Sequence, residues 1–186
     1  MLKATIFVAA PHSSFLDAFV FFILGLPSGV SRIENARIPF MGPLVRAIQP
    51  ILVSREDSQN KILVIEEIKK RAAPDSDWPQ LLVFPEGTTT NRSCLITFKP
   101  GAFIPGLPVQ PIVVQYNNKL DTITWTWEGF KAFEVVFYTL CQFSNFMEVT
   151  YLPVYVPNEQ EKMDAKLFAR NVRSKIAELV VQNLLF

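Results

Sequence analysis

Short apolar runs that alternate with helical patterns restrict the possible folds of this chain more than any other feature. Five runs predict buried strands, at residues 5–10, 50–55, 80–84, 108–115 and 148–156. Helical patterns are found at residues 14 to about 24, 58 to about 73 and about 165 to 184. Strands separated by helices are typical of an α/β fold, so we predict a mainly parallel central sheet flanked by helices.

The connections between these elements are rich in turn residues. Residues 25–29 contain two glycines and a proline, which predicts a turn. Residues 38–46 contain two prolines and a glycine, and we expect a loop that leads into a short helix. Because 186 residues without a linker or an internal repeat fit one domain with a sizeable core, we predict a single domain over residues 1–186.

Composition narrows the classes of function. The net charge is only +1, so the charge pattern does not favour binding to nucleic acid. Cys94 and Cys141 lack the spacing of metal ligands, so we predict free thiols and no metal site. No apolar stretch reaches the ~20 residues that a membrane-spanning helix needs, and the first residues lack the pattern of a signal peptide.

His12 is the single histidine of the chain, and Asp17 follows it by five residues. Histidine is the usual general base near neutral pH, and a neighbouring carboxylate can orient its ring. Five residues within one helix would separate the two side chains by about 140°. We therefore expect His12 in the turn before a helix that Ser14 caps, folded back over the first turn that carries Asp17. The alternative is that Asp17 only completes the cap and His12 is a surface residue.

Further polar residues follow the ends of predicted strands, as His12 does. Arg55 ends the second strand and Glu86 follows the third. Ligands of open α/β sheets bind at the carboxyl ends of the strands, so these residues are candidates for one pocket. Arg92 and Lys99 add cations that could bind phosphate. Taken singly, each has a simpler explanation as a solvated charge or part of a tight turn.

Four sequence blocks occur in the order and with the spacing of the glycerolipid acyltransferase family: His12-x4-Asp17, Val53-Ser54-Arg55, Phe84-Pro85-Glu86-Gly87-Thr88 and Val109-Gln110-Pro111-Ile112. Residues 98–102, with the sequence Phe-Lys-Pro-Gly-Ala, are similar to a further element of that family. Residues 86–106 and 118–127 resemble the lysophosphatidylcholine acyltransferase branch. The resemblance covers nearly the whole chain.

The resemblance implies acyl transfer from acyl-CoA to the free hydroxyl of a lysophospholipid, with a lysophosphatidylcholine-like acceptor. His12 would take the proton of that hydroxyl, and Asp17 would orient the ring and stabilise its charge. The acceptor hydroxyl is itself the nucleophile, which agrees with the lack of a Gly-x-Ser-x-Gly motif. The family implies no cofactor and no metal, with acyl-CoA as co-substrate.

The resemblance also implies which residues bind substrate: Arg55, Glu86, Gly87, Thr88, Arg92 and Lys99. Arg55 with Glu86 and Gly87 would hold the phosphate and glycerol backbone of the acceptor. The Glu86 carboxylate cannot bind phosphate directly, so we expect it to contact a hydroxyl or to position Arg55. Arg92 and Lys99 would contact phosphates of either substrate.

Two other functions stay open at this stage. A catalytically weak relative could bind lipid without turnover, and a hydrolase could release fatty acid from acyl-CoA with water as the acceptor. The resemblance further implies that the domain is part of a longer, membrane-anchored protein of the endoplasmic reticulum, with the Golgi and the lipid droplet as alternatives.

Aromatic residues are candidates for contact with a membrane surface. They follow the His12–Asp17 turn and recur after residue 124: Phe19, Phe21, Phe22, Trp125, Trp127, Phe130 and Phe133. An extended Trp125-Thr126-Trp127 segment would point both indoles to one side, and tryptophan suits a boundary between water and lipid. The alternative is that these rings fill the core.

Overall fold

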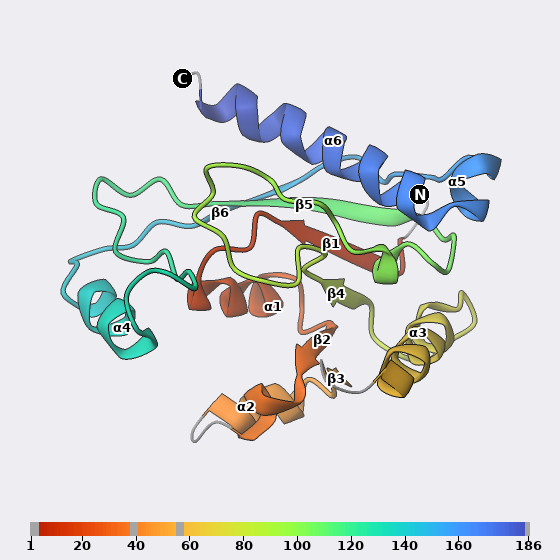
Figure 1. Ribbon diagram of the computed structural model, residues 1–186, viewed down its shortest axis with the longest axis horizontal. Helices are drawn as coiled ribbons and strands as arrows, with labels where there is room; N and C mark the ends of the chain where they lie inside the picture. The colour runs from red at the N-terminus through yellow and green to blue at the C-terminus, as the bar shows by residue number, and fades with distance from the viewer. Residues whose placement is uncertain (1–3, 38–40, 55–57, 185–186) are drawn as a thin grey trace.

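A six-stranded sheet forms the centre of the structure, a computed structural model that describes residues 4–37, 41–54 and 58–184 (Figure 1). The strands lie in the order β3-β2-β4-β1-β5-β6. They are β1 Ile6–Ala10, β2 Ser28–Arg32, β3 Ile51–Val53, β4 Leu81–Val83, β5 Val109–Gln115 and β6 Glu148–Tyr151. Neighbouring strands are parallel except β5 and β6. The predicted α/β fold with a mainly parallel sheet is confirmed.

Helices cover both faces of this sheet. The α-helices are α1 Phe19–Ile23, α2 Met41–Ala47, α3 Ser58–Ala72, α4 Ala132–Leu140, α5 Glu159–Met163 and α6 Ala165–Leu184. Short 3-10 segments are η1 Phe15–Ala18, η2 Ile33–Arg37 and η3 Pro100–Ala102. The helix predicted at residues 14–24 is therefore a 3-10 turn that continues into a short α-helix.

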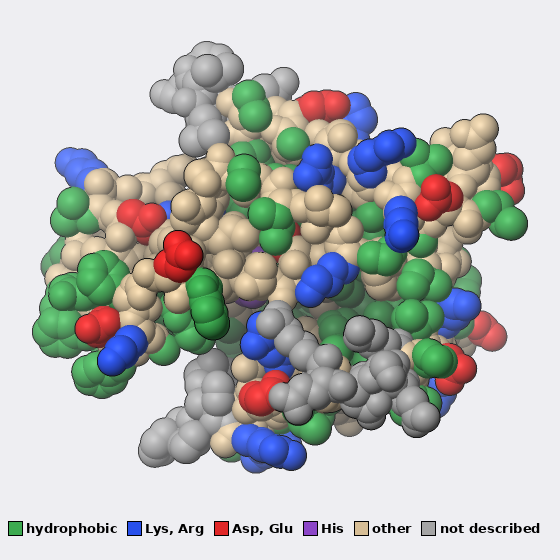
Figure 2. All heavy atoms as spheres, viewed as in Figure 1, with side chains coloured by type: hydrophobic (Ala, Val, Ile, Leu, Met, Phe, Trp, Pro, Cys, Tyr) green, Lys and Arg blue, Asp and Glu red, His purple; other side chains and the backbone are tan. Residues whose placement is uncertain are grey.

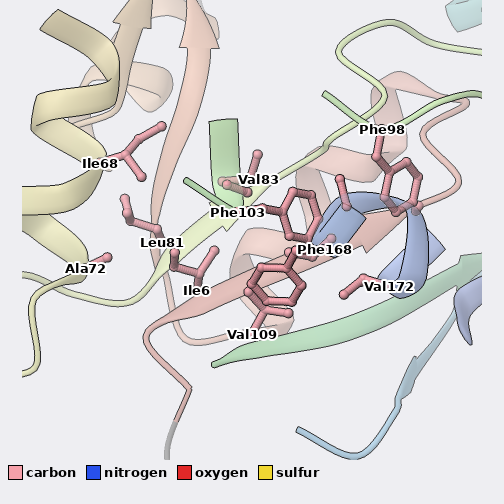
Figure 3. Close-up of a cluster of buried hydrophobic side chains, with 14 of the residues drawn as sticks. Ile6, Ile68, Ala72, Leu81, Val83, Phe98, Phe103, Val109, Phe168 and Val172 are labelled. Carbon is pink, nitrogen blue, oxygen red and sulfur yellow. The ribbon is translucent and has the colours of Figure 1, made fainter. Parts of the chain in front are cut away.

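Alternate residues of β1 supply two separate cores. Ile6, Val8 and Ala10 face α3, η3 and α6, where Phe103, Phe168 and Val172 are also buried (Figure 3). Phe7 and Ala9 face α1 on the other side. Every residue of β1 is buried, and its sequence is continuously apolar. Both features are typical of a central strand in a parallel sheet.

The register of the sheet decides which polar residues meet. β1 pairs in parallel with β4, with Val8 opposite Val83. The two strands therefore end side by side, and the segments that follow them, which carry His12 and Glu86, leave the same edge of the sheet. This is the edge where open α/β sheets bind ligands.

The turn predicted at residues 25–29 is wrong in its second half, because Ser28 and Gly29 belong to β2 and pair with β4. The segment has few residues that favour strands, and its pairing with two neighbouring strands overrides that local preference. Gly29 is required by close packing, since a Cβ there would lie 2.7 Å from the ring of Phe21.

Two features of the C-terminal half differ from the sequence-based expectation. Residues 132–140 form α4, which begins where the Glu134 carboxylate accepts a hydrogen bond of 2.8 Å from the Lys131 N–H. The strand predicted at residues 148–156 is shorter, with β6 ending at Tyr151 and an isolated bridge from Val109 to Tyr155. No helix among the described residues is both long and apolar enough to cross a membrane.

Candidate active site

His12 and Asp17 form a close pair just beyond the end of β1. The Nδ1 atom of His12 lies 2.6 Å from Oδ2 of Asp17. A carboxylate only accepts hydrogen bonds, so this contact places the proton of a neutral ring on Nδ1 and leaves Nε2 on the opposite side. Ser14 caps η1 as expected, and its side chain accepts from the Leu16 N–H. The predicted placement of His12 in the turn before the helix is confirmed.

The Asp17 side chain is buried, with only 1% of its surface exposed, and both of its oxygens accept hydrogen bonds. Oδ2 also accepts from the backbone N–H groups of Ser13 and Ser14, at 2.8 and 3.1 Å. Oδ1 accepts from the hydroxyl of Tyr116 at 2.5 Å. Donors on both oxygens replace the water that the buried carboxylate has lost.

The segment after β4 fixes the backbone of His12. The His12 N–H donates to Oε1 of Glu86 at 2.7 Å, and the His12 carbonyl accepts from the Thr90 N–H at 2.8 Å. The ring of His12 stacks on Phe84, with centroids 4.4 Å apart. The side chain keeps 25% of its surface exposed. In Figure 2 the purple of the histidine is visible only within a recess of the face in view.

Glu86 therefore holds the backbone of His12 in place, which is a contact that the sequence did not indicate. Its side chain is buried, and this burial raises the pKa of its carboxyl above the ordinary 4.5, although the hydrogen bond from His12 opposes the rise. The expected roles of Glu86 in contacting a hydroxyl or positioning Arg55 stay predictions.

We expect Glu86→Gln to change how stability depends on pH. A raised pKa means that the folded state binds the Glu86 proton more tightly than the unfolded state does, so this group lowers stability as pH rises above the ordinary pKa of 4.5. Glutamine keeps an oxygen for the His12 N–H without the charge, and urea unfolding of the variant should lack that fall. The matched variant Glu86→Ala loses the acceptor and should cost about 1–3 kcal/mol. Identical pH dependence in wild type and Glu86→Gln would contradict a buried carboxyl.

Tyr116 is a member of the site that sequence reasoning missed. It follows β5, the other neighbour of β1, and no motif marks it. Burial and the Asp17 carboxylate raise the pKa of the Tyr116 hydroxyl above its ordinary value, so it remains a donor. Its position one residue after a strand adjacent to β1 was the only available signal.

We expect Tyr116→Phe to retain the fold and to shift the pH–rate profile. The variant leaves Oδ1 of Asp17 without its hydroxyl donor, which should cost about 1–3 kcal/mol of stability. A carboxylate that has lost a donor attracts the imidazole proton more strongly, so the acidic limb of kcat should move to higher pH. An unchanged limb would show that Tyr116 does not act through Asp17.

Gly87, Thr88 and Lys99 lie around the same segment. Gly87 has a φ of +65°, and a Cβ there would be 2.5 Å from Nζ of Lys99. Glycine is therefore needed both for the backbone conformation and for the close approach of the ammonium. Thr88 is exposed. The Lys99 ammonium thus sits beside the turn that carries Glu86, and substrate binding by these three residues stays a prediction.

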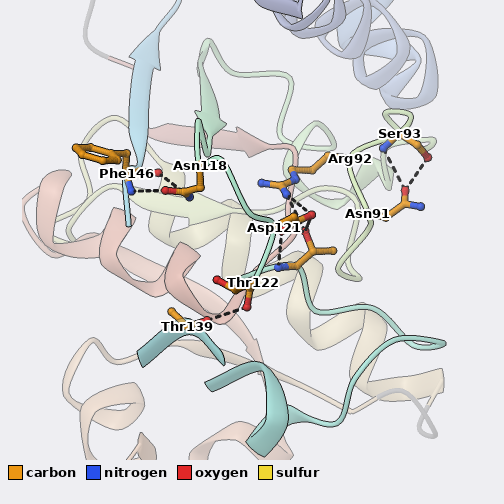
Figure 4. Close-up of polar contacts among 9 residues, drawn as sticks. Asn91, Arg92, Ser93, Asn118, Asp121, Thr122, Thr139 and Phe146 are labelled. Carbon is orange, nitrogen blue, oxygen red and sulfur yellow. Dashed lines mark hydrogen bonds and ion pairs between the residues drawn. The ribbon is translucent and has the colours of Figure 1, made fainter. Parts of the chain in front are cut away.

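Arg92 is tied to the segment after β5. Its Nη2 lies 2.8 Å from Oδ2 of Asp121 and 2.7 Å from Oγ1 of Thr124 (Figure 4). Burial would raise the pKa of the Asp121 carboxyl, but hydrogen bonds from Thr124 and the charge of Arg92 lower it. The Arg92 guanidinium also lies over the ring of Tyr116, 5.6 Å from its centroid. These contacts join the segment that carries Arg92 to the segment after β5. The predicted contact of Arg92 with phosphate stays a prediction. Arg55 lies outside the described residues.

Comparison with known proteins identifies the family. The family model described as acyltransferase matches residues 2–115, which is more than half of the chain. The chain therefore belongs to the acyltransferase family. It is 56% identical to lysophosphatidylcholine acyltransferase 2 of Homo sapiens over 177 residues, and 52% identical to lysophosphatidylcholine acyltransferase 1 of Danio rerio over 176 residues. Each alignment covers 95% of this chain, so the predicted resemblance to that branch is confirmed.

The chain spans about a third of the length of these relatives, 32% and 34% respectively. Among solved structures, it is similar to the crystal structure of the 1-acyl-sn-glycerophosphate acyltransferase PlsC from Thermotoga maritima. The TM-score is 0.56 at 17% identity, over 96% of this chain and 68% of that chain. This likeness supports the fold.

Proposed function

We propose that this domain transfers a fatty acyl group from acyl-CoA to the free hydroxyl of a lysophospholipid, with His12 as general base. The observation that carries the proposal is the 2.6 Å contact between His12 Nδ1 and Asp17 Oδ2, which leaves Nε2 available to a substrate hydroxyl. Membership of the acyltransferase family and the names of the relatives support the reaction class.

In the proposed reaction, Nε2 of His12 accepts the proton of the acceptor hydroxyl as its oxygen attacks the thioester carbonyl. The C–S bond then breaks, and the departing CoA sulfur takes the proton from the imidazolium. Asp17 stabilises the imidazolium during the step and holds its ring in place, as the carboxylate of a catalytic triad does. The contacts of His12 with Glu86, Thr90 and Phe84 keep the base oriented without substrate.

A lysophosphatidylcholine-like acceptor is the best candidate, because relatives that are 56% and 52% identical to this chain carry that name. Arg55 is proposed to contact its phosphate, because Arg55 falls in a family block. No cofactor enters the proposed step, because acyl-CoA supplies the activated acyl group.

A transfer assay tests this proposal. Radiolabelled acyl-CoA is incubated with the domain, with and without lysophosphatidylcholine. We expect label in phosphatidylcholine only when the acceptor is present. Label that appears as free fatty acid at the same rate in both samples would identify a hydrolase, and a lack of any product would favour a binding protein without turnover.

We further propose that the domain works at the surface of a membrane, such as that of the endoplasmic reticulum. Exposed apolar side chains gather on and around α4 in an aromatic patch: Trp127, Phe130, Phe133, Phe137, Leu140, Phe143 and Phe146. Figure 2 shows this patch as the green area over α4, at the left. Large exposed apolar patches mark interaction surfaces, and aromatic rings suit the boundary between water and lipid. Both proposed substrates carry acyl chains.

Other candidate aromatics fall outside this patch or are partly covered. Phe21 packs over Gly29 in the second core, as the alternative of core packing predicts. Phe19 and Phe22 are about half exposed on α1. Trp125 is 37% exposed and its backbone N–H donates to Ser13, whereas Trp127 is 94% exposed. Trp127 is therefore the better probe of the two.

We expect the domain to float with phosphatidylcholine vesicles and the double variant Trp127→Ala with Phe133→Ala to float less. The reason is that both rings expose most of their surface and would lose it from water at the bilayer. The matched control is Ile62→Ala with Leu63→Ala, which removes two side chains on α3 that are each 61% exposed. Equal flotation of the two double variants, or no flotation of wild type, would contradict docking through the aromatic patch.

A further inference from the structure

A cationic cleft lies on the side of the active site away from α4. Its volume is about 540 Å³, and it opens between the Lys99 turn and the first turns of α6. Four basic residues line it: Lys99, Lys166, Arg170 and Arg173. The whole chain has a net charge of only +1, so this is a local concentration of positive charge.

The helix period explains why three of these cations face the cleft together. Lys166, Arg170 and Arg173 are spaced by four and then three residues, which places them on one side of α6 along about 10 Å of its axis. Phe168 and Val172 lie between them in sequence and are buried in the core. Figure 2 shows blue side chains gathered over α6 on the face in view.

The three α6 cations of the cleft have no carboxylate partner among the described residues. Asp164 also lines the cleft, but its Oδ1 caps α6 by accepting from the Lys166 and Leu167 N–H groups. In the described part of the chain, no carboxylate oxygen lies within 4 Å of a basic nitrogen of Lys166, Arg170 or Arg173. Arg173 donates to the Leu95 carbonyl at 3.1 Å, which anchors its guanidinium to the wall.

Lys99 connects this cleft to the base. Its ammonium lies against Gly87, and the adjacent Glu86 accepts the hydrogen bond of the His12 N–H. A ligand that binds phosphates in the cleft can therefore extend past Lys99 toward His12. α4 and the start of α6 lie toward opposite ends of the molecule (Figure 1), so the cleft is remote from the aromatic patch.

We propose that the cationic cleft binds the phosphates of the nucleotide end of acyl-CoA, an inference that rests on the proposed function. Coenzyme A carries a 3′-phosphate and a diphosphate at one end and the thioester at the other, joined by a long flexible arm. Several phosphates on one end match four cations, and arginine binds phosphate oxygens through paired N–H groups. A phosphocholine head group carries one phosphate beside a fixed positive charge, which four cations match poorly.

Charge reversal on α6 tests the proposal in steady-state kinetics. We expect Lys166→Glu with Arg170→Glu to raise the KM for acyl-CoA by about tenfold or more, because each phosphate contact that is reversed weakens binding. The kcat and the KM for lysophosphatidylcholine should stay within about twofold of wild type. Both side chains are exposed, so the fold should persist. The matched control is Lys175→Glu, further along α6, which should leave the KM for acyl-CoA unchanged.

Kinetics with different substrates distinguish whether the cleft binds the phosphates of acyl-CoA or the phosphate of the acceptor. Acyl-dephospho-CoA lacks the 3′-phosphate, so wild type should use it less well than acyl-CoA, and the double variant should discriminate less between the two. A rise in the KM for lysophosphatidylcholine alone would overturn the proposal and assign the cleft to the acceptor. Unchanged KM values for both substrates would also overturn it.

A binding measurement separates failure of this inference from failure of the proposed function. Adenosine 3′,5′-bisphosphate needs no turnover, and its binding can be followed by calorimetry. Binding to wild type that is lost in the double variant supports the cleft as a nucleotide phosphate site whatever the transfer assay shows. No binding to wild type, together with normal acyl transfer, would overturn the cleft while leaving the proposed function intact.

Discussion

Replacement of His12 by asparagine is expected to lower kcat by about 10²–10⁴-fold, the range for loss of a general base. The chain has no second histidine that could substitute for it. Asparagine can place an amide N–H near the position of Nδ1, so the Asp17 carboxylate keeps a donor. The variant lacks any group at the position of Nε2, where the proposed reaction needs a proton acceptor.

In His12→Asn, the effect on kcat can be measured separately from any effect on stability. Asp17 retains the Ser13, Ser14 and Tyr116 donors in the variant, so the melting temperature should change little. Circular dichroism and thermal unfolding check this before kinetics are compared. A folded His12→Asn protein with wild-type kcat would overturn the role of His12 as base.

Replacement of Asp17 by asparagine should also lower kcat by about 10²–10⁴-fold, because a neutral amide cannot stabilise the imidazolium as a carboxylate does. The surroundings can accommodate the amide. Its oxygen can accept from the Ser13 and Ser14 N–H groups, while its nitrogen donates to the Tyr116 oxygen. The amide oxygen also keeps the contact with the Ser14 N–H that completes the capping box, so the first turn should survive.

Tyr116→Phe is the matched control for this variant, since it changes the surroundings of Asp17 without removing the charge. We expect its kcat to fall far less than that of Asp17→Asn. If both variants lose the same activity, the arrangement of the buried hydrogen bonds matters and the charge of Asp17 does not. A variant Asp17→Asn that melts much earlier but turns over normally would leave Asp17 as a cap alone.

The sequence was sufficient to predict the pairing of His12 with Asp17 because the determinants are local. A proline after a buried strand, a serine cap and an acid three residues later define the turn, and the structure has that cap. The α/β class was equally accessible, since β1 and the core of β5 are continuous apolar runs.

The missed parts depend on contacts between distant segments. β2 has weak strand preference and is held by β3 and β4, so its own residues do not predict it. The hydrogen bonds of Tyr116 to Asp17 and of His12 to Glu86 join residues 99 and 74 positions apart in the chain. Their pairing follows from the order of the parallel strands, which a single sequence does not specify.

The α6 cations illustrate the same limit. The helix itself was predicted from the sequence, but only the structure shows that Lys99 lies beside its basic residues. Residues 67 to 74 positions apart in the chain thus form one surface.

The most direct test of the account follows the single imidazole itself. Because His12 is the only histidine, ¹⁵N NMR of the labelled domain reports its protonation and tautomer without ambiguity. We predict that the neutral ring carries its proton on Nδ1, facing Asp17, and that kcat/KM rises with the neutral fraction measured on the same sample. A neutral ring protonated on Nε2, or a rate that does not follow the protonation of His12, would contradict the account.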